Sequence, residues 1–187
     1  MNKKIIIAVV VLALGFASFF LLTLGPKKIE LKDLEKNLPE GIKVWQVGNL
    51  YEVSNKTDGY ILKMPETWKG FKSLSYSAEK ESEEPKTLLI LEGLEPGDLF
   101  AVSAYQLKES KTDLESWLNQ LLEKSKELNW QKEKKKAGKF NAIKVSENKY
   151  LENLVSYFFK KGARIYEVSG FSEETIKEIV KEGKWGK

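Results

Sequence analysis

Alternating apolar and polar residues predict a series of short β-strands in the chain after residue 50. Two of these strands flank a Thr57-Asp58-Gly59 turn, and two others flank Lys160-Lys161-Gly162, so each pair is expected to form a hairpin. The predicted strands are Tyr51–Asn55, Tyr60–Met64, Phe71–Ala78, Thr87–Leu91, Phe100–Leu107, Trp130–Lys134, Asn141–Val145, Leu154–Phe159 and Arg164–Ser169.

Two segments instead show the three- and four-residue spacing of an amphipathic helix. The first begins at Thr112, which with Glu115 matches a capping box, and its apolar stripe extends to Leu128. The second begins at Ser172 and ends at Gly183. Strands, a helix, more strands and a last helix predict an α+β domain with a mainly antiparallel sheet.

The N-terminal part has a different pattern, because Ile5–Leu24 is a run of 20 residues without a charge. A helix of that length spans a bilayer core of about 30 Å, so residues 1–28 are predicted to form a signal anchor with one transmembrane helix. A cleaved signal peptide is the alternative. Cleavage after Gly15 or Ala17 would leave an apolar stretch on the new N-terminus, which favours the uncleaved anchor.

Two features of the sequence give opposite predictions for the side of the membrane on which the domain lies. Basic residues are more numerous after the apolar run than before it, which alone would place the C-terminal part in the cytoplasm. Long domains cross membranes largely regardless of charge, and a short basic tip before an apolar run is typical of secretory signals. The expectation is therefore a single-pass membrane protein with an extracytoplasmic domain.

Residues 29–50 are charged, contain Pro39 and Gly41, and are predicted to be a juxtamembrane tether. The domain is expected to occupy residues 51–187. Trp45 lies in the tether, outside the strong periodic elements, and is a candidate either for contact with a partner protein or for holding the tether against the domain.

Composition excludes several kinds of chemistry. The 187 residues include no Cys and no His, which removes disulfides, thiol nucleophiles, imidazole bases and the commonest zinc ligands. The net charge of +4 comes entirely from four Lys in residues 1–28, since the remainder holds 27 basic and 27 acidic residues. A neutral domain with a single Arg does not favour nucleic-acid binding.

The remaining candidates for chemistry are weak. Glu92, Glu95 and Asp98 surround a predicted turn and would offer oxygen ligands to a metal such as Ca²⁺, although charged turns are common and the spacing is not that of an EF-hand. Ser77 and Lys80 match an S-x-x-K pattern, but they lie at the end of a strand and lack the companion motifs. No catalytic residue, cofactor or metal is assigned.

A cluster of Lys lies between the two predicted helices. Lys134, Lys135 and Lys136 form its centre and are candidates for contact with an acidic partner, although solvent-facing strand positions explain them more simply.

Four sequence features follow one another between residues 50 and 185. They are Gly59-Tyr60 with Pro65 and Trp68, the stretch Leu114–Trp117, the turn from Gly138 to Ala142, and the Tyr157–Tyr166 hairpin with its terminal helix. In these features and their order the chain resembles PsbP-like domains, although Gly183–Gly186 departs from that family. The resemblance implies an αβα sandwich with a central antiparallel sheet, and a role in binding or assembly rather than catalysis.

The expected function is therefore a membrane-anchored extracytoplasmic module that binds or assembles an envelope protein. It contacts the membrane through Ile5–Leu24. The alternatives are a carboxylate- or Lys-dependent envelope hydrolase, and an accessory protein that binds a solute or a metal.

Overall fold

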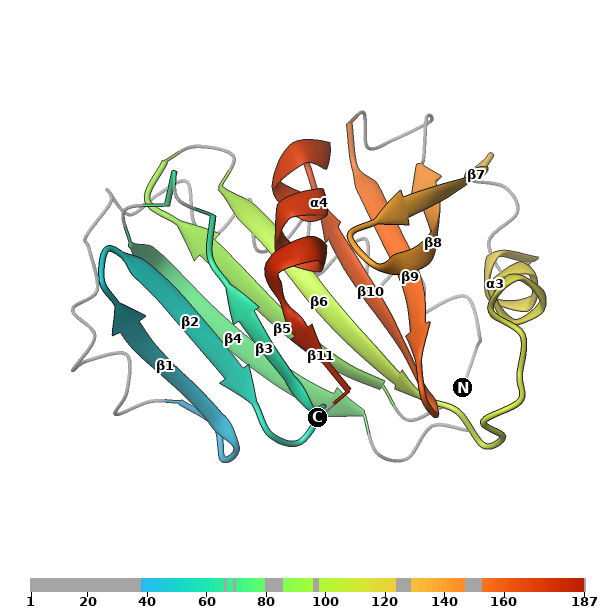
Figure 1. Cartoon of the computed structure of the whole chain (residues 1–187), viewed down its shortest axis with the longest axis horizontal. Helices are drawn as coiled ribbons and strands as arrows, with labels where there is room; N and C mark the ends of the chain where they lie inside the picture. The colour runs from blue at the N-terminus through green and yellow to red at the C-terminus, as the bar shows by residue number, and fades with distance from the viewer. Residues whose placement is uncertain are drawn as a thin grey trace.

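The computed structural model describes residues 38–65, 67–68, 70–79, 86–95, 98–123, 129–146 and 153–186. Their strands and helices, labelled in Figure 1, are β1 (Ile42–Val47), β2 (Leu50–Asn55), β3 (Tyr60–Lys63), β4 (Phe71–Glu79), β5 (Lys86–Gly93), β6 (Leu99–Gln106), α3 (Leu114–Glu123), β7 (Gln131–Ala137), β8 (Phe140–Ser146), β9 (Val155–Lys161), β10 (Arg164–Gly170), α4 (Glu173–Glu182) and β11 (Lys184–Trp185).

Seven strands form a large sheet in the order β4-β5-β6-β10-β9-β8-β7, and each neighbouring pair is antiparallel. A smaller sheet, β1-β2-β3-β11, lies across one face of it (Figure 1). The last strand of the chain closes the small sheet, since Trp185 pairs with Tyr60 of β3.

The prediction of an α+β domain built as an αβα sandwich is wrong, because the described residues are mostly in β-strands. In the part of the chain that the structure describes, eleven strands form two sheets and the two helices have ten residues each. The layer that faces the large sheet is mainly the small sheet, with α4 beside it. Alternation identifies a strand and its buried face, but it does not reveal which sheet the strand joins, and the fold class depends on that.

The main core fills the space between the two sheets. Its centre is a cluster of four aromatic side chains, Tyr60, Phe159, Tyr166 and Trp185, which we call the aromatic cluster. The Trp185 ring lies 4.8 Å from the Phe159 ring, 5.1 Å from the Tyr166 ring and 5.5 Å from the Tyr60 ring, between centroids. Such contacts stabilise a core beyond the area that they bury, so the cluster fixes how the sheets lie on one another.

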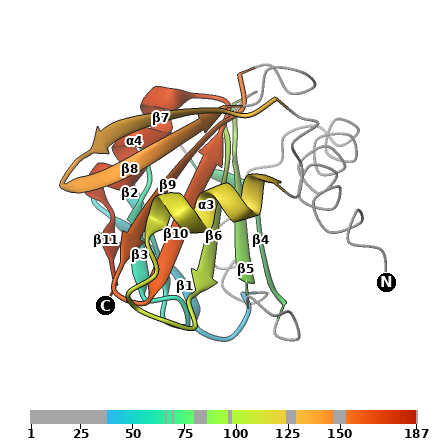
Figure 2. The same cartoon turned by 90° about the vertical axis from the view of Figure 1, so that its right-hand side faces the viewer.

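The two helices lie on opposite faces of the large sheet. Helix α4 buries Ile176, Ile179 and Val180 in the main core, beside the small sheet. Helix α3 packs Trp117 and Leu118 on the other face, in the foreground of Figure 2. Adjacent residues of one strand therefore enter different cores.

Of the two predicted N-terminal helix caps, one is confirmed and the other is wrong. Ser172 caps α4 as predicted, because its hydroxyl accepts a hydrogen bond from the Thr175 N–H at 3.3 Å. The capping box at Thr112 is wrong: the Asp113 carboxylate accepts from the Ser116 N–H at 2.9 Å, while the Thr112 hydroxyl donates to the Glu109 carbonyl. The helix is therefore capped by the carboxylate of Asp113, one residue after Thr112, which accepts a hydrogen bond from a free backbone N–H of the first turn.

The predicted tether, residues 29–50, contains strand β1 in the structure. The Ile42 and Val44 side chains of this strand are buried in the main core. The predicted anchor Ile5–Leu24 lies outside the described residues. Among the residues that are described, no helix has the length and apolarity needed to cross a membrane.

A buried carboxylate joins the two sheets at the β2–β3 turn. Asp58 is 5% exposed, and its Oδ2 accepts hydrogen bonds from Asn55 Nδ2 at 2.6 Å, from Thr87 Oγ1 at 2.7 Å and from Tyr76 OH at 3.3 Å. Thr87 and Tyr76 belong to the large sheet. The Tyr166 hydroxyl also donates to the Asp58 carbonyl at 2.8 Å. The turn is thus held to the large sheet by polar contacts at the edge of an apolar core.

Replacing Asp58 tests this connection. Burial raises the pKa of the Asp58 carboxyl, although its hydrogen bonds act in the opposite direction. Asp58→Ala removes the acceptor of one buried donor, Asn55, and of two partly buried donors, Thr87 and Tyr76, and should lower the unfolding free energy by about 2–4 kcal/mol. Asp58→Asn keeps an oxygen there and should cost less. Denaturant unfolding of the full chain in detergent, followed by Trp fluorescence, measures both, and equal stability of Asp58→Ala and wild type would contradict the role.

The Asp58 carboxyl should also make the unfolding free energy depend on pH. A folded-state pKa above the unfolded value of 3.8 means that the folded protein holds the proton more tightly. The wild-type stability should therefore fall relative to Asp58→Asn as the pH rises from 3.8 through the folded-state pKa. Denaturant titrations of both proteins across this range measure the difference.

Candidate functional site

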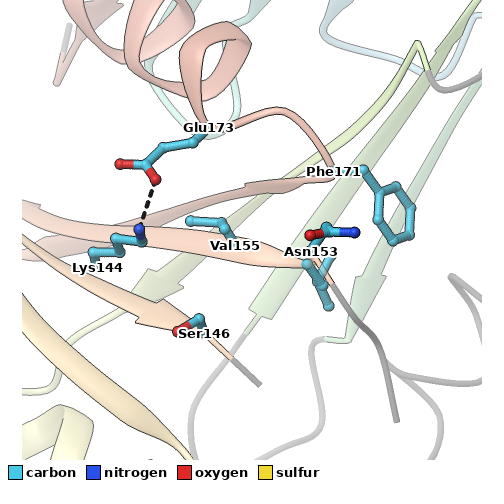
Figure 3. Close-up of a pocket in the computed structure, with 7 residues that line it drawn as sticks. Lys144, Ser146, Asn153, Val155, Phe171 and Glu173 are labelled. Atoms are coloured by element: carbon cyan, nitrogen blue, oxygen red, sulfur yellow. Dashed lines mark hydrogen bonds and ion pairs between the residues drawn. The ribbon is translucent and has the colours of Figure 1, made fainter. Parts of the chain in front are cut away.

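A surface pocket of about 310 Å³ lies at one end of the large sheet, where β8 ends, β9 begins and β10 passes into α4 (Figure 3). Its lining combines charged, polar and apolar side chains. They are Lys144, Ser146, Asn153, Leu154, Val155, Phe171 and Glu173.

The local structure explains how these residues meet. Ser146 lies opposite Val155 in the β8–β9 register, and two residues earlier Lys144 lies opposite Tyr157. The N-cap at Ser172 starts α4 immediately after β10, so Glu173 stands in the first turn of the helix, above Lys144. Phe171 falls in the short connection between these elements and is 38% exposed.

Asn153 completes the rim of the pocket. Its backbone has φ of +72°, in the left-handed region that Asn adopts more readily than most residues. In Figure 3 its side chain lies between Val155 and the Phe171 ring. The rim therefore offers an amide and an aromatic ring side by side.

The charged groups of the pocket are bound to one another. Lys144 Nζ lies 2.6 Å from Glu173 Oε2, while Lys177 Nζ and the Tyr157 hydroxyl lie 2.8 Å and 2.7 Å from Glu173 Oε1. The hydrogen bonds from Lys144, Lys177 and Tyr157 lower the pKa of Glu173 to about 2. Burial, and then the carboxylate of Glu173, raise the pKa of Tyr157.

This arrangement suits binding better than catalysis. A general base must accept a proton, whereas the Glu173 carboxylate is held ionised by three donors and the Lys144 ammonium is engaged by that carboxylate. The groups left to meet a ligand are the Phe171 ring, the Asn153 amide and the Ser146 hydroxyl. They provide apolar contact and hydrogen bonds without a net charge.

The acidic residues suggested as metal ligands do not form a group of three in the part of the chain that the structure describes. Glu92 lies in β5 and pairs with Lys72, whose Nζ is 2.9 Å from Glu92 Oε1. Glu95 is exposed, and Asp98 contacts the same turn through its backbone, with its carboxyl pKa raised by burial. No group of three potential ligands suited to a metal occurs among the described residues.

The basic cluster lies on β7, an edge strand of the large sheet. Lys134 Nζ lies 2.8 Å from a Glu115 carboxylate oxygen of α3, and Lys135 Nζ lies 2.5 Å from Glu133, while Lys136 is exposed. Charged side chains on an edge strand discourage pairing with another strand. This supplies a structural reason for the cluster that requires no acidic partner.

The two other candidates also lie on strands. Trp45 is in β1, opposite Glu52 of β2, and its side chain is partly buried. Ser77 is exposed on β4, and Lys80 lies outside the described residues. Neither Trp45 nor Ser77 lines the pocket.

The pocket was not predicted from the sequence. The nearest feature that was predicted is the helix start at Ser172, between the pocket residues Phe171 and Glu173. Lys144 and Asn153 carry no local pattern that separates them from other surface residues, because their meeting depends on the β8–β9 register and on the return of α4.

Comparison with known proteins adds no assignment. No family model, curated protein or solved structure matches this chain. The resemblance to PsbP-like domains therefore stays a prediction.

The ion pairs of Glu173 give a testable pH dependence. The folded-state pKa of Glu173 is near 2, against 4.5 for the free side chain. The ionised carboxylate therefore stabilises the folded protein above pH 4.5, and this stabilisation is lost as the pH falls towards 2. Glu173→Gln should lower the unfolding free energy by about 1–2 kcal/mol at pH 6, a modest value because the pairs are partly exposed. Denaturation at pH 6 and pH 3 should show the difference shrinking, and a constant difference would contradict the assignment.

Proposed function

We propose that this chain is a membrane-anchored, extracytoplasmic module that binds or helps to assemble an envelope protein through the pocket beside Phe171. The carrying observation is the pocket itself, in which an exposed aromatic ring stands beside charges that are already paired. Exposed aromatic residues at hollows are frequent anchors of protein interfaces. The resemblance to PsbP-like domains, a family of binding and assembly modules, supports the same function.

The paired charges indicate what the partner offers. Because Lys144 and Glu173 neutralise each other, a charged partner group would have to break an existing ion pair on entering the pocket. A neutral segment with an apolar side chain and one or two hydrogen-bonding groups fits Phe171, Asn153 and Ser146. An anchor at Ile5–Leu24 would raise the local concentration of such a partner, so that even a weak contact would suffice.

A photoreactive phenylalanine analogue in place of Phe171 tests the proposal in membranes that contain the full chain. Irradiation should give a discrete adduct with one protein. The matched control is the same analogue at Lys108, which is exposed and lies at the opposite end of the large sheet, next to the β9–β10 turn. That position should give no such adduct.

A second change examines the role of the pocket. Ser146→Phe should fill the hollow and reduce the adduct from position 171 at least several-fold, while circular dichroism confirms that the protein is folded. Equal adducts from positions 171 and 108, or an adduct that survives Ser146→Phe unchanged, would refute binding at this pocket.

A further inference from the structure

The outward face of the β1–β2 hairpin carries a small apolar patch. Ile42 and Val44 point into the main core, so strand alternation places Trp45 and Val47 on the other face. Val47 is 51% exposed and pairs with Leu50 of β2, which is partly buried on that same face. We call Trp45, Val47 and Leu50 the hairpin patch.

Basic residues lie on the same outward face of the small sheet as the hairpin patch. The register places Glu52 opposite Trp45 and Lys63 opposite Glu52, so all three share the outward face. In the next row Lys43, Ser54, Ile61 and Lys184 are neighbours. The charged residues of this face are thus three Lys against one Glu, whereas residues 29–187 as a whole are neutral.

The position of the hairpin in the chain is the second observation. Seventeen residues, 25–41, separate the end of the apolar run from Ile42. A fully extended chain of that length spans at most about 60 Å. In an anchored chain, Ile42 at the start of the hairpin therefore lies within this distance of the end of the anchor.

We infer that the hairpin patch rests on the surface of an anionic bilayer beside the anchor. Trp side chains favour the interface between lipid headgroups and acyl chains, where the ring is apolar and its N–H meets polar groups. Val47 and Leu50 extend the apolar contact, and Lys43, Lys63 and Lys184 meet the lipid phosphates. This inference rests on the proposed membrane anchor and adds a second, peripheral contact to it.

The contact would leave the Phe171 pocket accessible. In Figure 1 the β1–β2 hairpin lies on one side of α4, and β8, which lines the pocket, lies on the other. A domain held at the hairpin would present the pocket at a fixed side rather than rotating freely on its anchor.

Tryptophan quenching in nanodiscs tests the contact. The full chain is reconstituted in discs of phosphatidylcholine and phosphatidylglycerol, with or without bromine on the acyl chains. Bromine should reduce the emission by up to about one fifth, the share of one Trp among five. Trp45→Phe should abolish this reduction. The matched control is Trp130→Phe, which removes another partly buried Trp, one that packs with α3, and should leave the reduction in place.

Each outcome bears on the inference. Quenching that persists in Trp45→Phe, or that disappears in Trp130→Phe, would overturn it, and Val47→Asp should also weaken the quenching if it holds. Equal quenching in discs of phosphatidylcholine alone would overturn the role of the Lys residues. A chain that enters the discs without quenching of Trp45 overturns the contact but leaves the proposed function standing, whereas a chain that does not enter the discs overturns both.

Discussion

The packing of the small sheet across the large one is the constraint on which the rest of the structure depends. The aromatic cluster unites Tyr60 of β3 with Phe159 and Tyr166 of the large sheet and with Trp185 near the end of the chain. The Trp185 indole N–H also donates to the Val180 carbonyl at 3.1 Å, which ties the end of α4 to the same core. The other end of α4, its first turn, lies over β8, where Glu173 pairs with Lys144 beside the pocket.

The sequence predicted the individual strands well and their assembly poorly. Strand alternation and two turn signals located nine of the strands, and the Ser172 cap located α4, because these features depend on neighbouring residues. The division into two sheets depends on contacts between distant residues. A strand of two residues such as β11 shows no alternation, and β1 lies in a charged stretch that favours a tether. The αβα prediction failed for these reasons.

The candidate site was harder to predict than the fold for a related reason. Residues that stood out by local density, such as Lys134, Lys135 and Glu92, form ion pairs with neighbouring side chains instead of a site. Lys144 and Glu173 did not stand out, because 29 positions separate them and only the antiparallel register with α4 brings them together. A high density of charged residues along the sequence is therefore a weak indicator of a binding site. Ion pairs between residues far apart in the sequence can be identified only from the folded structure.

The same packing relates the two surfaces that we propose for binding. Asp58 holds the β2–β3 turn against β4 and β5, and β2 carries the hairpin patch at its other end. The aromatic cluster holds β3 next to β11 and thereby to α4, whose first turn carries Glu173. A rotation of the small sheet on the large one would therefore move the hairpin patch relative to the pocket. The polar contacts of the buried Asp58 carboxylate resist such a rotation, because sliding would separate it from its donors Tyr76 and Thr87 on the large sheet. The orientation of the pocket relative to the hairpin patch is in this sense a property of the core between the sheets.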